Sequence, residues 1–217
     1  MKVQPNSVYA IDDDHLVFCG DICDPRFVPD ILSPSLPSHF DHIFIDPHWG
    51  VVTLRLSYDD LDLPPPPYQD YLSALFTFCA DHAVSGTSVV ITAPTRAPGL
   101  IFTELARLDF NESWRATVPY GSCDTSCYLA GGAFKNGNCV IPKDFSDCAD
   151  WQAVVKRVLV NALGTGWTFF DPCAGRLLKF ELALKIGAIA YAVELSPKLL
   201  ADGLSRLSDL GHKITRL

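Results

Sequence analysis

The stretch Phe44-Ile45-Asp46-Pro47-His48-Trp49-Gly50 places an acidic residue and a proline directly after a run of apolar residues. The same pattern returns in Phe169-Phe170-Asp171-Pro172-Cys173-Ala174-Gly175. A buried strand that ends in an acidic residue at a tight turn is how open α/β sheets present polar groups to a ligand at their carboxyl edge. Two such turns predict two ligands that meet in one cleft, which is the layout of a group-transfer enzyme.

Segments with the periods of strands and helices alternate around these turns. Strands are predicted at 15–19, 42–46, 88–92, 114–118, 168–171 and 188–193, and helices at 25–32, 68–83, 100–108, 151–163, 177–186 and 197–209. This alternation predicts an α/β fold, a mostly parallel twisted sheet with helices on both faces. We expect Asp46 and Asp171 at the same carboxyl edge of that sheet.

Length and composition limit the class of protein. The 217 residues predict a single domain spanning 1–217, and the 48% hydrophobic and 19% charged residues exclude wholesale disorder. No apolar run reaches the roughly 18 residues of a membrane span. The first residues lack the apolar core of a secretory signal, so we expect a cytoplasmic protein whose eight cysteines are reduced.

Two segments interrupt the alternation. A polyproline-like loop at 63–68 follows the first Asp-Pro turn, and a long polar segment at 121–147 has the length of a functional loop. We expect both to flank the cleft and the second to contact a substrate or a partner.

The order of these motifs resembles that of amino-group DNA methyltransferases, the enzymes that methylate exocyclic nitrogens of adenine or cytosine. Asp46-Pro47-His48-Trp49 is similar to their catalytic Asp-Pro-Pro-Tyr/Trp motif, and the segment 171–175 is similar to their S-adenosylmethionine loop, Asp-Pro-Phe-x-Gly-Ser-Gly. Gly20-Asp21 and Glu194 also match in position. The catalytic motif precedes the cofactor motif, as in the permuted members of that family.

The resemblance implies a Rossmann-like methyltransferase fold with S-adenosylmethionine as cofactor and adenine N6 in nucleic acid as the target. Asp46 and the Pro47 carbonyl would polarise the target amine, and Trp49 would stack on the base, with His48 beside them. An acid at this position favours adenine, because cytosine-N4 enzymes of the family usually have serine there. The cofactor-binding residues implied are Asp21, Asp171, Pro172, Cys173, Ala174, Gly175 and Glu194.

Two departures from the family pattern leave an alternative open. His48 stands where the family has a second proline, and Arg176-Leu177-Leu178 stands where the cofactor loop has Ser-Gly-Thr. A leucine in the left-handed conformation that a glycine would adopt costs about 1–2 kcal/mol. The alternative is therefore a catalytically inactive methyltransferase-fold scaffold or regulatory subunit.

The charge of the chain bears on its partners. A formal net charge of −8 without a basic stripe predicts weak binding to bare duplex, because phosphate contacts dominate nucleic-acid affinity. If nucleic acid is the substrate, a basic partner subunit should deliver it, docking near 64–67 or 121–147; homo- or hetero-oligomers both stay open. We predict no metal, and interpret the run 12–14 of aspartates as a solvated turn and Cys123, Cys127, Cys139 and Cys148 as lacking zinc-site spacing.

Overall fold

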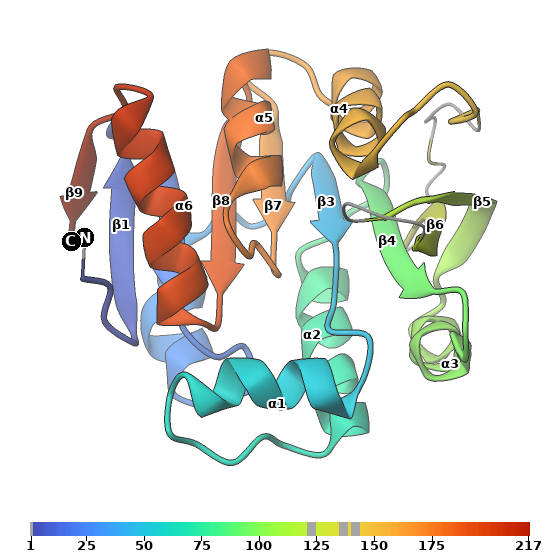
Figure 1. Cartoon of the computed structure of the whole chain (residues 1–217), viewed down its shortest axis with the longest axis horizontal. Helices are drawn as coiled ribbons and strands as arrows, with labels where there is room; N and C mark the ends of the chain where they lie inside the picture. Colours follow the sequence, from blue (N-terminus) through green and yellow to red (C-terminus); the bar gives the residue numbers. More distant parts are fainter. Residues whose placement is uncertain (1, 121–124, 135–138, 140–143) are drawn as a thin grey trace.

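The computed structural model describes residues 2–120, 125–134, 139 and 144–217, which form one nine-stranded sheet in the order β5-β6-β4-β3-β7-β8-β2-β1-β9 (Figure 1). The strands are β1 (Ser7–Ile11), β2 (His15–Cys19), β3 (His42–Ile45), β4 (Ser88–Pro94), β5 (Asn111–Pro119), β6 (Ser126–Ala133), β7 (Thr168–Asp171), β8 (Ile189–Glu194) and β9 (Ile214–Arg216). The helices are α1 (Val51–Asp59), α2 (Tyr68–Asp81), α3 (Gly99–Arg107), α4 (Trp151–Ala162), α5 (Leu178–Ile186) and α6 (Pro197–Asp209). A short π-helical turn, Val28–Leu32, and a 3-10 turn, Ser33–Ser35, precede β3.

The sheet is mixed, so the expectation of a mostly parallel sheet is wrong. The neighbours β2, β8, β7, β3 and β4 pair in parallel, but β1, β9, β5 and β6 pair antiparallel on the two sides. The turn at 12–14 explains why β1 and β2 pair antiparallel, because a connection of three residues can join only antiparallel strands. Asp12 and Asp13 take positive φ in this turn and contact His212 and Lys213.

The expectation of helices on both faces is confirmed. Side chains of α4, α5 and α6 pack in one core, and those of α1, α2 and α3 pack in the core on the other face. Neighbouring residues of one strand reach opposite cores: Phe169 lies in the first and Phe170 in the second. Because the central strands are buried on both faces, their sequences are continuous apolar runs.

Strand β6 lies within the segment 121–147, which the sequence predicts to be a loop. Gly131 and Gly132 lower the strand propensity of β6, yet the fold requires them. A Cβ on Gly131 would lie 2.2 Å from the Trp114 ring, and one on Gly132 would lie 2.3 Å from the backbone oxygen of Asn111. The rest of the expected loop lies partly outside the described residues.

Among the described residues, no helix combines the length and the apolar composition needed to cross a membrane.

Candidate active site

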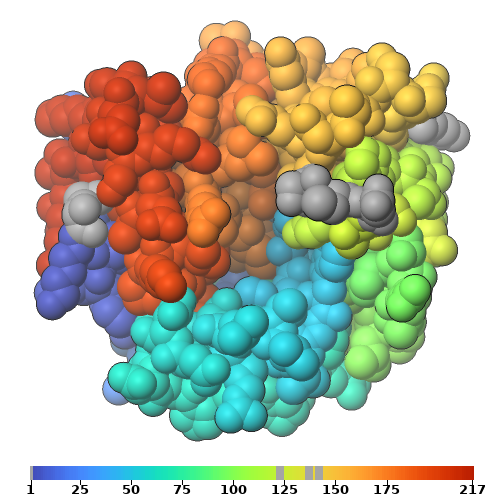
Figure 2. All heavy atoms as spheres, in the orientation of Figure 1, coloured from blue at the N-terminus to red at the C-terminus, as the bar shows by residue number. Residues whose placement is uncertain are grey.

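The carboxyl ends of neighbouring parallel strands bring the acidic residues of the motifs to one edge of the sheet. Asp46 follows β3, Asp171 ends β7, Glu194 ends β8, and Asp21 follows β2. A cavity of about 270 Å³ opens at this edge. Figure 2 shows the molecule hollowed between α6, α4 and α1.

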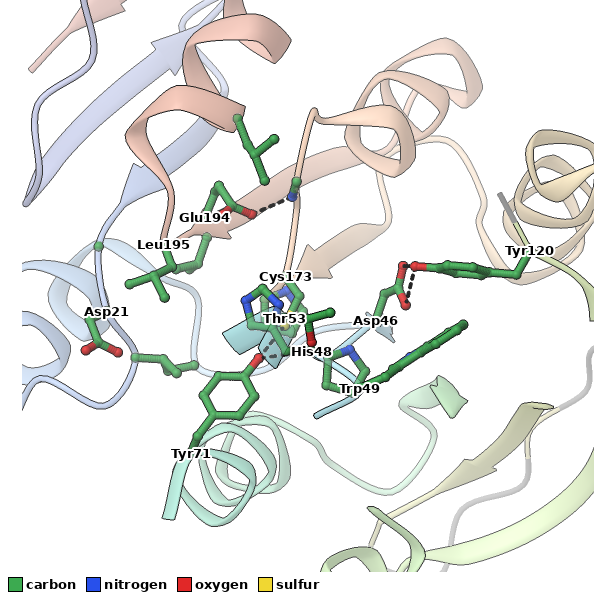
Figure 3. A pocket seen from close by; sticks show the side chains of 17 residues that line it. Asp21, Asp46, His48, Trp49, Thr53, Tyr71, Tyr120, Cys173, Glu194 and Leu195 are labelled. Atoms are coloured by element: carbon green, nitrogen blue, oxygen red, sulfur yellow. Dashed lines mark hydrogen bonds between the residues drawn. The ribbon is translucent and has the colours of Figure 1, made fainter. Parts of the chain in front are cut away.

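The cavity receives side chains from most of the predicted site. Its walls include Gly20, Asp21, Asp46, Pro47, His48, Trp49, Pro172, Cys173, Gly175 and Glu194, together with Thr53, Tyr71, Tyr120 and the apolar Ile22, Val193, Leu195 and Leu199. Asp46 and Tyr120 point toward each other at one end, and Glu194 lies at the other (Figure 3). Asp171 and Ala174 are buried, at 0% and 3% exposure, beneath this surface.

Side chains from three separate segments hold the Asp46 carboxylate. Thr92 Oγ1, on β4, donates to Oδ1, and the Tyr120 hydroxyl, after β5, donates to Oδ2 at 3.2 Å. The Lys179 ammonium, on α5, lies 3.9 Å from Oδ2. Trp49 Nε1 donates to Thr92 Oγ1 at 3.3 Å, which links the indole to the same network.

Three aromatic rings form a cluster of tilted contacts beside Asp46. The ring centroid of Trp49 lies 4.1 Å from that of Tyr120, at an interplanar angle of 41°, and Tyr120 lies 4.8 Å from Trp151. Burial and the neighbouring Asp46 carboxylate raise the pKa of Tyr120, so its phenol remains a protonated donor at neutral pH. Tyr120 therefore contacts both Trp49, through its ring, and Asp46, through its hydroxyl.

His48 is fixed through its backbone. The Tyr68 hydroxyl donates to its carbonyl at 2.6 Å, and its amide donates to the Tyr71 hydroxyl at 3.4 Å. Burial lowers the pKa of His48 below its usual value, although Asp46 opposes that shift, so the ring is neutral near pH 7. The polyproline loop thus anchors the motif through Tyr68, its last residue. Pro64, Pro65 and Pro66 line an adjoining groove.

Backbone amides hold the Glu194 carboxylate at the other end of the cavity. The Gly175 amide donates to Oε2 at 2.6 Å and the Ser196 amide to Oε1 at 2.7 Å. Burial raises the pKa of Glu194 to about 7, against these two hydrogen bonds. Each oxygen keeps acceptor capacity for a further donor.

Helix α1 supports this end from outside the motifs. The Tyr58 hydroxyl donates to Asp21 Oδ2 at 2.6 Å, and Asp60, just after the helix, accepts a hydrogen bond from Ser196 Oγ. The Cys23 amide donates to Asp21 Oδ1 at 2.8 Å, which closes the turn after β2. Asp21 and Ser196 are thereby both tied to the segment that follows Trp49.

The altered loop after Gly175 takes the conformation that glycine would favour. Leu177 has φ +62° and ψ +27°, in the left-handed region, and its side chain is completely buried. Burying a leucine contributes about 1.5–3 kcal/mol, which offsets the backbone cost. Helix α6 packs closely on the loop, since a Cβ at Gly203 would lie 2.8 Å from the Arg176 carbonyl.

Thr92, Tyr120 and Lys179 contact Asp46 but are not among the site residues expected from the sequence. Thr92 ends a predicted strand at the same sheet edge, which was a usable signal, and Tyr120 closely follows another. Lys179 stood out only as a cation within an apolar helix. Of the four cysteines weighed as zinc ligands, Cys127, Cys139 and Cys148 are buried and Cys123 lies outside the described residues. The part of the chain that is described holds no group of three or more potential metal ligands.

Comparison with known proteins gives matches in structure alone. No protein-family model and no curated protein sequence matches the chain. Among solved structures, M1.HpyAVI matches at 12% identity and TM-score 0.62, over 88% of this chain and 98% of that one. TTHA0409 of Thermus thermophilus, a putative DNA modification methylase complexed with S-adenosyl-L-methionine, matches at 16% identity and TM-score 0.63, over 89% and 94%. PvuII DNA methyltransferase, cytosine-N4-specific, matches at 9% identity and TM-score 0.62, over 91% of each chain.

This chain has the fold of DNA methyltransferases. At identities of 9–16% the likeness is one of fold, and it confirms the resemblance seen in the sequence at that level. The cavity and the four acidic residues described above lie at the carboxyl edge of the sheet, which is where ligands bind in open α/β sheets.

Proposed function

We propose that this protein is an S-adenosylmethionine-dependent N-methyltransferase, with adenine N6 in nucleic acid as its favoured target. One observation carries the proposal: Asp46, with Trp49 beside it, and Glu194 open onto the same cavity from strand ends of a methyltransferase fold. Structural neighbours that bear this fold include M1.HpyAVI and TTHA0409, each also solved with the cofactor.

The residues around Glu194 fit the cofactor. The free acceptor positions of its carboxylate suit the two hydroxyls of a ribose, with Asp21 nearby on the same wall. Gly175 has φ +54° and open space where a Cβ would stand, so a ligand can approach its backbone. Pro172 and Cys173 complete this wall, and Asp171 and Ala174 support it from beneath.

Asp46 and Pro47 would prepare the substrate amine. An exocyclic amine is a poor nucleophile because its lone pair is conjugated into the ring. The Asp46 carboxylate and the Pro47 carbonyl would each accept one amine hydrogen, which frees the lone pair, a preorganised electrostatic effect. S-adenosylmethionine, when bound, would supply an activated methyl group: the nitrogen would gain the methyl, sulfur would keep the electrons of the broken bond, and the proton of the methylated amine would pass to solvent.

Trp49 would stack on the base, a contact worth about 1–3 kcal/mol. Tyr120 occupies that side of the cavity, so the base must displace its phenol from Asp46 and Trp49. A base within a duplex must also leave the helical stack to reach the cavity.

A direct assay tests the proposal. The purified protein is incubated with methyl-labelled S-adenosylmethionine and adenine-containing single-stranded or duplex oligonucleotides, with Asp46→Ala as the control. We expect label in N6-methyladenine with the parent protein, at an oligonucleotide concentration high enough to offset its weak binding to the isolated chain, and no label with Asp46→Ala. Absence of transfer together with absence of cofactor binding in a calorimetric titration would contradict it.

The inactive scaffold is the second candidate, and Tyr120 is the observation that favours it. Its ring contacts Trp49 and its hydroxyl donates to Asp46, so both residues have a partner within the protein when no substrate is bound. Micromolar cofactor binding would favour the enzyme. Cofactor binding without transfer to any nucleic acid, nucleoside or added partner would favour the scaffold.

Delivery of nucleic acid is proposed to need a basic partner. The net charge of −8 opposes binding of bare duplex, and exposed apolar side chains gather on α1 and the loop after it. They are Val51 (61% exposed), Val52 (74%), Leu56 (63%) and Leu63 (52%). Fluorescence anisotropy with labelled duplex at physiological salt checks this, because sub-micromolar binding by the isolated protein would exclude the need for a partner.

A further inference from the structure

Lys179 is a buried cation that none of the sequence motifs includes. It lies in the first turn of α5 with 5% of its surface exposed. Its ammonium is 3.3 Å from Asp171 Oδ2 and 3.9 Å from Asp46 Oδ2, and donates to the Cys173 carbonyl at 3.3 Å. Because a buried charge is costly unless it is paired, this lysine is stable here only through these contacts.

The Lys179 ammonium pairs with one carboxylate from each of the two Asp-Pro turns. Asp46 and Asp171 stand at the ends of the neighbouring strands β3 and β7, and their like charges repel in a poorly solvated setting. Asp171 Oδ2 has no hydrogen bond, so the ion pair with Lys179 is its described polar contact. One cation thus balances a carboxylate on the cavity surface and another beneath it.

The position of Lys179 matters most when a substrate enters. Tyr120 shares Asp46 Oδ2 with Lys179, whereas Thr92 holds Oδ1. Once a substrate base displaces the phenol, Thr92 and Lys179 are the described side chains that still hold the carboxylate, one on each oxygen.

We propose that Lys179 is a positioning residue for methyl transfer, whose ammonium ties the Asp46 carboxylate to Asp171 and keeps its oxygen directed at the substrate amine. This inference rests on the proposed function. This role also explains why a lysine that follows the segment 171–175 contacts Asp46 of the other Asp-Pro turn.

Two variants separate positioning from stability. Lys179→Met leaves the buried Asp171 carboxylate and the partly buried Asp46 carboxylate without their shared cation. Both the thermal midpoint and kcat should therefore fall, kcat by about 100-fold. Lys179→Met/Asp171→Asn removes the excess charge, so its midpoint should recover while kcat stays low, because Asp46 still lacks the ammonium. Lys185→Met is the matched control, since Lys185 lies on the same helix, is exposed, and pairs with Glu181 away from the cavity.

A binding experiment gives a readout without catalysis. Adenosine and purine riboside differ only in the exocyclic amine, so their affinity ratio, measured with saturating S-adenosylhomocysteine, reports the amine contact. We expect the parent protein and Lys185→Met to prefer adenosine about 10-fold, and Lys179→Met to bind both nucleosides alike.

The outcomes are distinct. Recovery of kcat in the double variant, or an unchanged preference for adenosine in Lys179→Met, would overturn the positioning role while leaving the proposed function standing. A parent protein that shows no preference would instead contradict adenine as the target, and the inference would fall with it.

Discussion

The two ends of the cavity hold their carboxylates by different means. At the Asp46 end, the donors are side chains distant in the sequence: Thr92 is 46 residues away and Tyr120 is 74 residues away. At the Glu194 end, the donors are backbone amides 19 and 2 residues away. A backbone donor survives most substitutions, whereas a side-chain donor is lost with its residue. The Asp46 end should therefore be the more sensitive to changes elsewhere in the chain.

The largest effect is expected at Asp46 itself. Asp46→Ala should lower kcat by about 1,000-fold or more, because the amine loses its charged acceptor, while the dissociation constant for S-adenosylmethionine changes little. Turnover assays paired with calorimetry measure both. Near-normal turnover in the variant would remove Asp46 from the chemistry.

Thr92 tests whether remote side chains hold the Asp46 end. Thr92→Val should lower kcat about 10- to 100-fold, since it removes the donor to Asp46 and the acceptor of Trp49. Thr92→Ser keeps the hydroxyl and should retain most turnover in the same assay. A loss in Thr92→Ser larger than that in Thr92→Val would point instead to packing of the buried methyl group, which valine keeps.

Glu194 tests the other end. Glu194→Ala should weaken S-adenosylmethionine binding by about 1–3 kcal/mol, as expected for hydrogen bonds to a charged group. Titration calorimetry at pH 8, where the carboxylate is ionised, measures the change. Unaltered affinity would show that the carboxylate only binds the Gly175 and Ser196 amides and does not contact the cofactor.

The same residue should make cofactor binding depend on pH. Burial raises the pKa of Glu194 to about 7, so protonation below that pH removes acceptors for the ribose hydroxyls. The dissociation constant should rise severalfold from pH 8 to pH 6 in the parent protein, and much less in Glu194→Gln. The free energy of unfolding should change in the opposite direction and be larger at low pH. Because the folded-state pKa of Glu194 is raised, its contribution is fully present below about pH 4.5 and is lost as the pH rises through about 7. A flat binding profile in the parent protein would contradict the assignment.

The smallest effect concerns the left-handed leucine. Leu177→Ala and Leu177→Gly both lose a buried side chain, but only glycine adopts φ +62° without strain. The glycine variant should therefore be more stable than the alanine variant by about 1 kcal/mol, the reverse of the usual order within helices. Urea unfolding compares them, and an alanine variant of equal or greater stability would show that the strain is negligible.

The same contrast explains what the sequence could predict. Asp46, Asp171 and Glu194 follow apolar strands, so their meeting at one edge followed from local pattern and chain order. Thr92, Tyr120 and Lys179 reach Asp46 only through the tertiary fold, which no local pattern encodes.

Among the secondary elements, α6, β2 and β7 have the predicted bounds. Helix α1 escaped prediction because it buries little and exposes valines and a leucine, which weakens its helical period. Strand β9 pairs with β1 from the other end of the chain, a contact that no neighbouring residue indicates.

The aromatic cluster at the Asp46 end also gives the site an intrinsic fluorescence signal. Trp49 and Trp151 both contact Tyr120, whereas Trp114 packs on Phe145 and Trp167 is 50% exposed. Displacement of Tyr120 would change the surroundings of two of the four tryptophans at once. Intrinsic emission is therefore a label-free signal of ligand entry at the Asp46 end, and Trp167, which lies apart from Tyr120, supplies a constant background to that signal.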